Sequence, residues 1–204
     1  MAKALIVLAP GFEEGETVEI IDVLRRSGFS CDSMSIAEAL VSGAHDIKIE
    51  ADYILNDDLT SFFNYDMLIL PGGWSGVDAM LNDSRVLDLV RYYNKHGKFV
   101  AAMCAAPNVL AKAGVLTGKT MTAYPGQKTE PFYSDAHYVN DVVVKDGNLI
   151  TSRGPATALP FAFALVDVLG GDSSFIKKRF LYQDLKNYPD GTESVILKGE
   201  QRSW

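Results

Sequence analysis

The sequence predicts a single α/β domain in which helices cover both faces of a mostly parallel sheet. Apolar segments at 4–9, 66–70 and 99–103 are continuous rather than alternating, which is typical of strands buried on both faces. Segments with helical periodicity follow them, and this alternation favours parallel βαβ units. The 204 residues suit about one ordinary domain, and no linker or repeat divides them. We therefore expect one domain over 1–204, in which 172–204 is a C-terminal extension.

The chain begins with a strand, a helix and a second strand. The strand at 4–9 ends at a Pro-Gly turn. Within 13–28, hydrophobic residues recur every three positions, acidic residues occupy the first turn and arginines the last, and a glycine ends the predicted helix. Residues 29–36 are expected to form the second strand. The alternating segment 47–54 predicts a short exposed strand or hairpin arm.

The following elements repeat the alternation of strand and helix. The strand at 66–70 ends at a Pro-Gly-Gly sequence, and a helix with one apolar face is predicted over 84–95. The strand at 99–103 leads into a helix predicted over 105–115.

The last part of the chain predicts a hairpin and a helix. An Asp-Gly pair divides 142–151 into two β-rich arms, which indicates a β-hairpin. An apolar helix is predicted over 157–169, and two glycines end it. The more polar tail at 172–204 has room for one short helix around 174–185.

Composition excludes several classes of protein. The chain has 19 basic and 26 acidic residues, and this net charge of −7 argues against a broad basic surface for nucleic acid or anionic membrane. Its two cysteines, Cys31 and Cys104, are too few for a disulfide-rich secreted scaffold. The first apolar run is too short for a signal peptide or a membrane span. We expect a cytoplasmic protein with no nucleic-acid or membrane partner.

Cys104 stands where a predicted strand turns into a helix, in the string AAMCAAP (101–107). Small neighbours suit a nucleophile elbow, because that turn is sharp and lifts the nucleophile out at the end of the strand. A helix N-terminus would lower the pKa of the thiol, and backbone N–H groups there would hold an oxyanion. The alternative is a small buried packing residue, which is the role we expect for Cys31.

Two other strand ends are expected to meet Cys104, because ligands of open parallel sheets bind outside the carboxyl ends of the strands. Three glutamates, Glu16 among them, follow the first strand, and Gly72 and Gly73 end another with backbone N–H groups that would line the cavity. One acid facing the thiol would hold a proton; charge at a helix N-terminus is the alternative for these acids. No phosphate-loop pattern and no histidine spacing typical of a metal site occurs, so we expect no metal and no cofactor.

Five strings, all in one order between residues 3 and 170, resemble the DJ-1/PfpI superfamily and most closely its DJ-1/ThiJ branch. The strings are LAPGFEEGETV (8–18), LPGGWSG (70–76), AAMCAAPNVLAKAG (101–114), AHYVND (136–141) and VVKDGNLITSRGPATA (143–158). The resemblance implies a flavodoxin-like three-layer α/β/α sandwich with a mostly parallel sheet and a β-hairpin. It also implies a homodimer. The tail beyond about residue 185 matches no part of it.

The resemblance further implies which residues form the site. Cys104 corresponds to the elbow cysteine of the family, and Glu16 to its buried, usually protonated partner acid. Gly73 and Ala105 would supply backbone N–H groups around the site. Further candidates for the pocket are Gly72, Tyr124, His137, Arg153 and Pro155.

The chain departs from the DJ-1 branch at several positions. Tyr124 replaces the histidine that often precedes the proline of the T-H-P segment, and tyrosine is a poor general base at neutral pH. His137 matches a more distal histidine of the family, for which a structural or interface role is the alternative. His45 stands where the dimer partner often supplies an arginine.

The leading functional hypothesis is a cysteine-dependent enzyme acting on small reactive dicarbonyls such as methylglyoxal. It would be a glutathione-independent, glyoxalase III-type lyase or a deglycase-like enzyme. The alternative is a redox-sensing or stress-protective protein in which Cys104 is oxidised without turnover. A peptidase or amidase is less favoured, because Ala105 follows Cys104 in place of the histidine of that branch.

Overall fold

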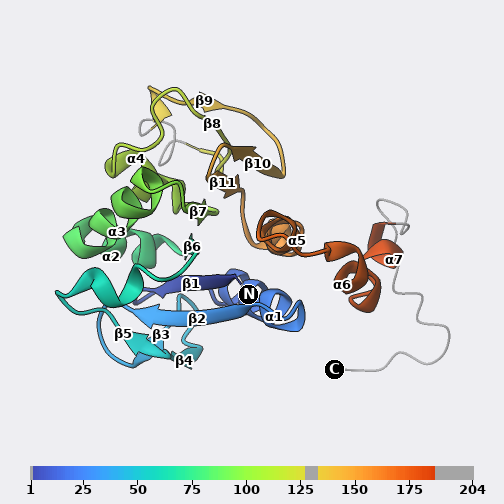
Figure 1. Ribbon diagram of the computed structural model, residues 1–204, viewed down its shortest axis with the longest axis horizontal. Helices are drawn as coiled ribbons and strands as arrows, with labels where there is room; N and C mark the ends of the chain where they lie inside the picture. Colours follow the sequence, from blue (N-terminus) through green and yellow to red (C-terminus); the bar gives the residue numbers. More distant parts are fainter. Residues whose placement is uncertain (1, 127–132, 187–204) are drawn as a thin grey trace.

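The computed structural model describes residues 2–126 and 133–186, and a seven-stranded sheet lies at its centre (Figure 1). The strand order is β10-β11-β7-β6-β1-β2-β5. β10 runs antiparallel to β11, and the other neighbours pair in parallel. The strands are β1 (Lys3–Leu8), β2 (Ser30–Ser35), β5 (Tyr53–Ile54), β6 (Met67–Leu70), β7 (Phe99–Ala102), β10 (Val143–Asp146) and β11 (Leu149–Ser152).

Helices cover both faces of this sheet, as the continuous apolar strands predict. One face packs against α1 (Glu14–Arg26) and α5 (Ala158–Val168). The other packs against α2 (Trp74–Asn82), α3 (Ser84–Lys95) and α4 (Pro107–Lys112). The predicted α/β sandwich with a mostly parallel sheet and a terminal hairpin is confirmed.

β1 shows why the strands are apolar along their whole length. Ala4 and Ile6 belong to the core beneath α1 and α5, whereas Leu5 and Val7 belong to the core on the opposite face. All four side chains are fully buried. Because successive residues of a strand point to opposite faces, a strand buried on both faces has no polar position to alternate with.

The segment predicted as a short exposed strand or hairpin arm at 47–54 contains two elements, of which the first is the arm of an antiparallel pair. β4 (Lys48–Glu50) pairs antiparallel with β3 (Leu40–Ser42) in a small sheet of its own, and β5 adds to the edge of the main sheet beside β2. The structure also adds α2, which directly follows the Pro-Gly-Gly turn. A further small sheet pairs β8 (Thr120–Met121) with β9 (His137–Tyr138). The described residues also include the 3-10 turns η1 (Leu59–Phe62) and η3 (Pro155–Thr157).

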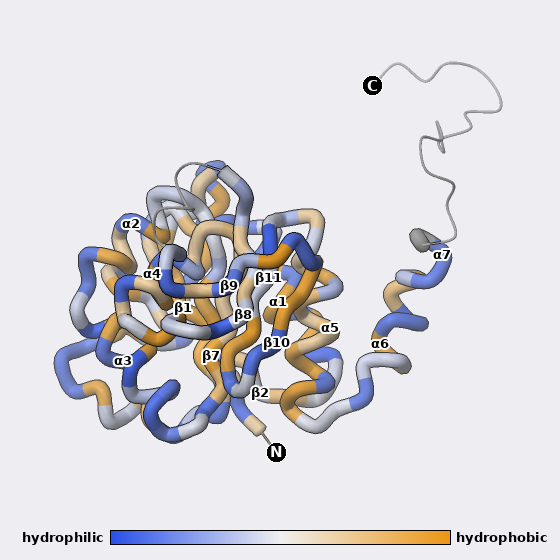
Figure 2. The backbone as a smooth tube through the Cα atoms, turned by 90° about the horizontal axis from the view of Figure 1, so that it is seen from above, coloured by the Kyte–Doolittle hydropathy of each residue, from blue (hydrophilic) through white to orange (hydrophobic). Residues whose placement is uncertain are grey.

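The beginning of the C-terminal extension forms two short helices where one was predicted. α6 (Ser173–Arg179) and α7 (Tyr182–Lys186) are separated at Leu181, whose φ of +53° breaks the helical path. Figures 1 and 2 show both helices at one side of the domain, beyond α5. The rest of the predicted tail lies outside the described residues.

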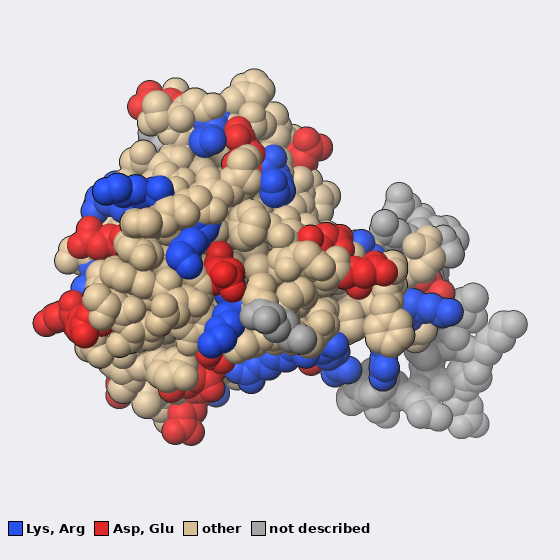
Figure 3. All heavy atoms as spheres, in the orientation of Figure 1, with Lys and Arg blue, Asp and Glu red and all other residues tan. Residues whose placement is uncertain are grey.

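Within the described residues, no helix is both long enough and apolar enough to cross a bilayer. Figure 3 shows acidic and basic side chains interspersed over the face that it draws.

Candidate active site

Cys104 occupies a sharp turn between β7 and α4. Its φ of +58° lies in the left-handed region, which Asp46 and Leu181 also occupy among the described non-glycine residues. This region costs a residue with a Cβ atom about 1–2 kcal/mol. Hydrogen bonds hold the turn: the Cys104 N–H donates to Ser152 O at 3.2 Å, and the Tyr124 N–H donates to Cys104 O at 2.8 Å. The backbone therefore has the strained turn that the small flanking residues predict.

Glu16 reaches the thiol from the first turn of α1. Its side chain is completely buried, and Oε2 accepts a hydrogen bond from the Gly72 N–H at 2.7 Å. A side-chain hydrogen bond also links the carboxyl group to the Cys104 thiol. A Cβ atom on Gly72 would lie 2.5 Å from Cys104 Cβ and 2.7 Å from Glu16 Oε2. The close approach of Glu16 to Cys104 therefore requires glycine at position 72.

Two backbone N–H groups face the sulfur of Cys104. They belong to Gly73 and Ala105. The interaction of each N–H group with the sulfur lowers the pKa of the thiol. Gly73 precedes the first residue of α2 and has a φ of +91°, which a residue without a Cβ atom adopts readily. Both N–H groups are placed to stabilise negative charge on the sulfur or on an oxygen bonded next to it.

Burial is the main influence on the pKa values of Glu16 and Cys104. It raises the pKa of Glu16 to about 7, although hydrogen bonds from Gly72 and Cys104 lower it. Burial and the neighbouring Glu16 charge raise the pKa of the Cys104 thiol to about 12. The expectation of a lowered thiol pKa is therefore wrong: α4 has 6 residues and begins at Pro107, too short and too late to outweigh burial. The coupled pair loses its first proton near neutral pH and retains the second.

The thiol lies at the bottom of a cavity of about 410 Å³. Cys104 is 8% exposed and is one of the residues that line this cavity. The cavity combines aromatic, acidic and backbone groups. Its lining residues are Glu13, Ala44, His45, Gly73, Trp74, Ser75, Cys104, Tyr124 and Pro155.

His45 lines this cavity and hydrogen-bonds the buried Glu14 carboxylate. The His45 N–H donates to Glu14 Oε1 at 2.6 Å, and His45 Nδ1 lies 3.0 Å from Glu14 Oε2. The hydrogen bond to Glu14 raises the pKa of His45. Within the described parts of the chain, Glu13, Glu14 and His45 are the one group whose ligand atoms are close enough to hold a metal ion. Because both Glu14 oxygens already interact with His45, the arrangement has the chemistry of an ion pair.

The predicted pocket residues divide into two groups. Tyr124 and Pro155 line the cavity, and Gly72 lies directly behind the thiol. His137 is exposed in β9, and the Arg153 guanidinium donates to Asn140 Oδ1. Neither His137 nor Arg153 lines the cavity.

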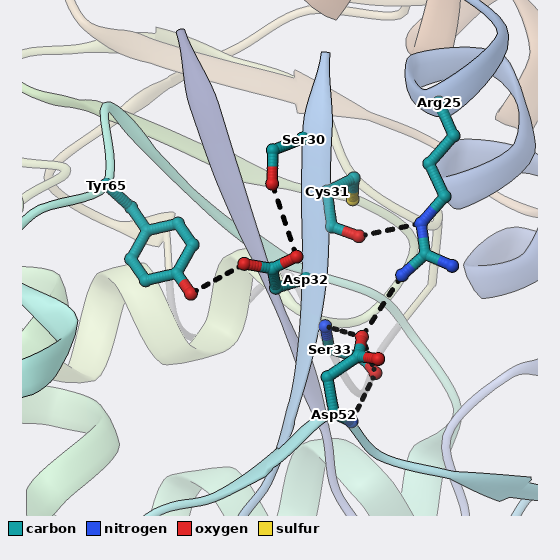
Figure 4. Close-up of polar contacts among 7 residues, drawn as sticks. All are labelled: Arg25, Ser30, Cys31, Asp32, Ser33, Asp52 and Tyr65. Atoms are coloured by element: carbon teal, nitrogen blue, oxygen red, sulfur yellow. Dashed lines mark hydrogen bonds and ion pairs between the residues drawn. The ribbon is translucent and has the colours of Figure 1, made fainter. Parts of the chain in front are cut away.

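Cys31 lies in β2, apart from the cavity, and is 1% exposed. Burial raises the pKa of its thiol to about 12. Figure 4 shows its carbonyl oxygen accepting a hydrogen bond from Arg25 Nε at 2.9 Å, while the same guanidinium binds Asp52 at 3.1 Å. These contacts tie α1 to β2 and to the segment before β5, which agrees with the structural role expected for Cys31.

Comparison with known proteins identifies the family of this fold and site. The model of the DJ-1/PfpI family matches residues 2–168. The chain belongs to the DJ-1/PfpI family. It is 43% identical over 174 residues to Protein dj-1beta of Drosophila melanogaster, which covers 83% of this chain and 90% of that protein. It is 33% identical over 154 residues to Deglycase PH1704 of Pyrococcus horikoshii, which covers 76% of this chain and 91% of the relative.

Solved structures of the DJ-1/PfpI family have the same fold. The crystal structure of Drosophila melanogaster DJ-1beta matches with a TM-score of 0.81 and 41% identity, covering 88% of this chain and 97% of that one. Oxidised Toxoplasma gondii DJ-1 matches with a TM-score of 0.79 and 29% identity, covering 92% of this chain and all 100% of the other.

Sequence reasoning missed several side chains of the cavity in this DJ-1/PfpI protein, Trp74 among them. Trp74 directly follows the glycine turn that ends β6, so its position was a usable signal. For His45 the one signal was the resemblance, in which the dimer partner often supplies an arginine at this place; its contact with Glu14, 31 residues earlier in the chain, is visible only in the structure.

Proposed function

We propose that this chain is a cysteine-dependent enzyme that converts small 2-oxoaldehydes such as methylglyoxal into hydroxy acids without glutathione. One observation carries the proposal: a buried Glu16 carboxyl group, with a pKa of about 7, is hydrogen-bonded to the Cys104 thiol beside a cavity. A group with a pKa near neutral is best suited to accept and return a proton. A family relative named Deglycase PH1704 supports this class of reaction.

The chemistry begins when ionised Glu16 accepts the thiol proton and the Cys104 sulfur adds to the aldehyde carbon. An S–C bond forms, the π electron pair of the carbonyl moves to oxygen, and the Gly73 and Ala105 N–H groups stabilise that oxygen. Glu16 then returns the proton to the oxygen, which gives a hemithioacetal. Glu16 next removes the proton from the former aldehyde carbon while the ketone oxygen gains a proton from solvent, which gives an enediol. Glu16 then returns its proton to the former ketone carbon, and the hydroxyl group on the sulfur-bearing carbon loses its proton to solvent, which gives the thioester of a 2-hydroxy acid. Water cleaves the S–C bond, so the hydroxy acid leaves and the thiol is restored.

Replacement of each cysteine tests this proposal. We expect wild type to convert methylglyoxal into lactate in glutathione-free buffer and Cys104→Ser to fall to the rate of the buffer alone. Cys31→Ser is the matched control and is expected to retain turnover, because Cys31 lies outside the cavity. Methylglyoxal loss and lactate formation are measured together. Equal rates for wild type and Cys104→Ser would contradict the proposal.

A second candidate function is redox sensing or stress protection by an oxidisable Cys104. Glu16 Oε1 favours it, because this buried oxygen has no hydrogen-bond partner among the described residues although it lies beside the site. One hydrogen peroxide molecule transfers an oxygen atom to the sulfur and leaves as water, giving sulfenic acid; a second gives sulfinic acid. A protonated Glu16 carboxyl group would then donate a hydrogen bond to the sulfinate.

Mild peroxide treatment is expected to add about two oxygen atoms to the protein, both at Cys104. The reason is access: Cys104 is 8% exposed at a cavity, whereas Cys31 is 1% exposed between α1 and the sheet. Intact mass followed by peptide mapping measures the site and extent of oxidation, with Cys104→Ser as the control. Oxidation of Cys31 before Cys104 would rule out the sensor.

A further inference from the structure

Two large aromatic side chains form one wall of the cavity and have no part in the proposed proton transfers. Trp74 and Tyr124 are 38% and 41% exposed, respectively, although residues of this size are usually more deeply buried. Their ring centroids lie 5.9 Å apart, and the rings meet edge to face at 83°. Both line the same cavity as Cys104.

The backbone that builds the reactive centre also fixes the position of this wall. Trp74 directly follows Gly73, whose N–H group faces the sulfur. Tyr124 donates its backbone N–H group to the carbonyl oxygen of Cys104 at 2.8 Å. Gly154 supports the Tyr124 ring closely, because a Cβ atom at that position would lie 3.3 Å from Tyr124 Cδ2. The two rings are therefore held at a set place relative to the sulfur.

The cavity also has a polar part of its lining. Glu13 and His45 line it, and Glu14 holds His45 from behind. A bound 2-oxoaldehyde must direct its aldehyde carbon to Cys104 and its oxygen to the Gly73 and Ala105 N–H groups. Its remaining substituent then gains most by lying against the aromatic wall, because apolar surface is removed from water there and ring edges meet ring faces.

We propose that Trp74 and Tyr124 together make the site selective for carbonyl electrophiles with a flat aromatic substituent over those with a methyl group. Phenylglyoxal is then a better substrate than methylglyoxal. The inference rests on the proposed reaction of Cys104 with small carbonyl compounds, and it names their preferred class.

Alkylation of Cys104 by two matched reagents tests the wall without any need for turnover. Phenacyl bromide and bromoacetone carry the same bromomethyl ketone and differ in a phenyl or a methyl substituent. In each reaction an S–C bond forms, the C–Br bond breaks, bromide leaves and the thiol proton passes to solvent. The measured quantity is the ratio of the two rate constants at Cys104, followed by peptide mapping and divided by the same ratio for free cysteine.

We expect wild type to favour phenacyl bromide, and Trp74→Ala and Tyr124→Leu each to lower the ratio about 3- to 10-fold. Trp74→Phe and Tyr124→Phe keep a ring at each position and are expected to retain most of the preference. Retention by these ring-preserving variants separates loss of the wall from loss of the fold.

Phe175→Ala is the control, because Phe175 is 60% exposed on α6 and does not line the cavity. It is expected to leave the ratio unchanged. An unchanged ratio in either Trp74→Ala or Tyr124→Leu overturns the proposal that the two rings act together. A different result would separate the two proposals. If these variants lose selectivity but wild type turns over neither methylglyoxal nor phenylglyoxal, the role of the aromatic wall stands and the proposed enzymatic function is wrong.

Discussion

Replacing Glu16 by glutamine is expected to lower kcat for methylglyoxal about 10²–10⁴-fold, the usual contribution of a positioned general acid–base group. The substitution removes the carboxylate that accepts the thiol proton, in a site where burial, the largest cause, and the Glu16 charge together raise the pKa of Cys104 to about 12. Glutamine has nearly the same shape, and its carbonyl oxygen still accepts the hydrogen bond that the Gly72 N–H donates at 2.7 Å. Steady-state kinetics and a parallel unfolding measurement separate lost proton transfer from lost stability.

The pH profile gives the same experiment a second readout. Glu16 accepts a proton only when it is ionised, and its pKa is about 7, so kcat/KM of wild type should fall as pH drops below that value. Glu16→Gln should not show this fall in kcat/KM at low pH. Glu19→Gln is the matched control, because it removes a carboxylate from α1 without altering a residue that lines the cavity; it should keep the fall in kcat/KM at low pH, moved to somewhat lower pH because the Glu19 charge raises the pKa of Glu16. A Glu16→Gln rate within tenfold of wild type would contradict the assigned role.

Replacing Gly73 by alanine is expected to lower the free energy of unfolding by roughly 2–5 kcal/mol and to remove most turnover. Gly73 has a φ of +91°, where a Cβ atom is strained. That atom would also overlap Gly11 O and lie 2.7 Å from Glu13 N. Both are backbone atoms, which cannot move away by rotation of a side chain. Relief of the overlap must move the Gly73 N–H group away from the sulfur.

Gly15→Ala is the control for this effect. Gly15 lies in the first turn of α1, and no atom lies within 4 Å of the Cβ atom that the substitution adds. Alanine is the better helix former, so this variant is expected to be neutral or more stable by up to about 1 kcal/mol. Urea unfolding measures both variants. Equal free energies of unfolding for Gly73→Ala and Gly15→Ala would contradict this prediction, because they would show that the turn at Gly73 has room for a Cβ atom.

The main sheet could be predicted from the sequence because its signals are local. A strand such as β1, apolar at every position, specifies burial on both faces, and the Asp-Gly pair specifies the β10–β11 hairpin. The short elements were harder to predict. β3, β4 and β5 have only two or three residues each, too few to show a clear pattern; β3 and β4 pair with each other, and β5 pairs with the more distant β2. The break between α6 and α7 depends on one residue, Leu181, whose backbone conformation has no sequence signal.

The candidate site shows the same division. Cys104 could be found from its small neighbours, since only small residues fit around a sharp strand-to-helix turn. The resemblance to the family singled out Glu16 from three nearby glutamates. The protonation of the pair could not be predicted, because a helix N-terminus was the one local influence visible in the sequence. Burial is a property of everything packed around the pair, and it outweighs that influence.

The sequence by itself determined the fold class, the elbow at Cys104 and the family. These depend on the spacing of apolar, small and turn-forming residues along the chain, which the backbone translates directly into strands, helices and turns. Only the tertiary structure decided that Glu16 is buried against the thiol, that His45 pairs with Glu14 and that Trp74 and Tyr124 meet at the cavity. These contacts join residues far apart in the chain, and their energies depend on solvent exclusion that exists only once the layers have packed.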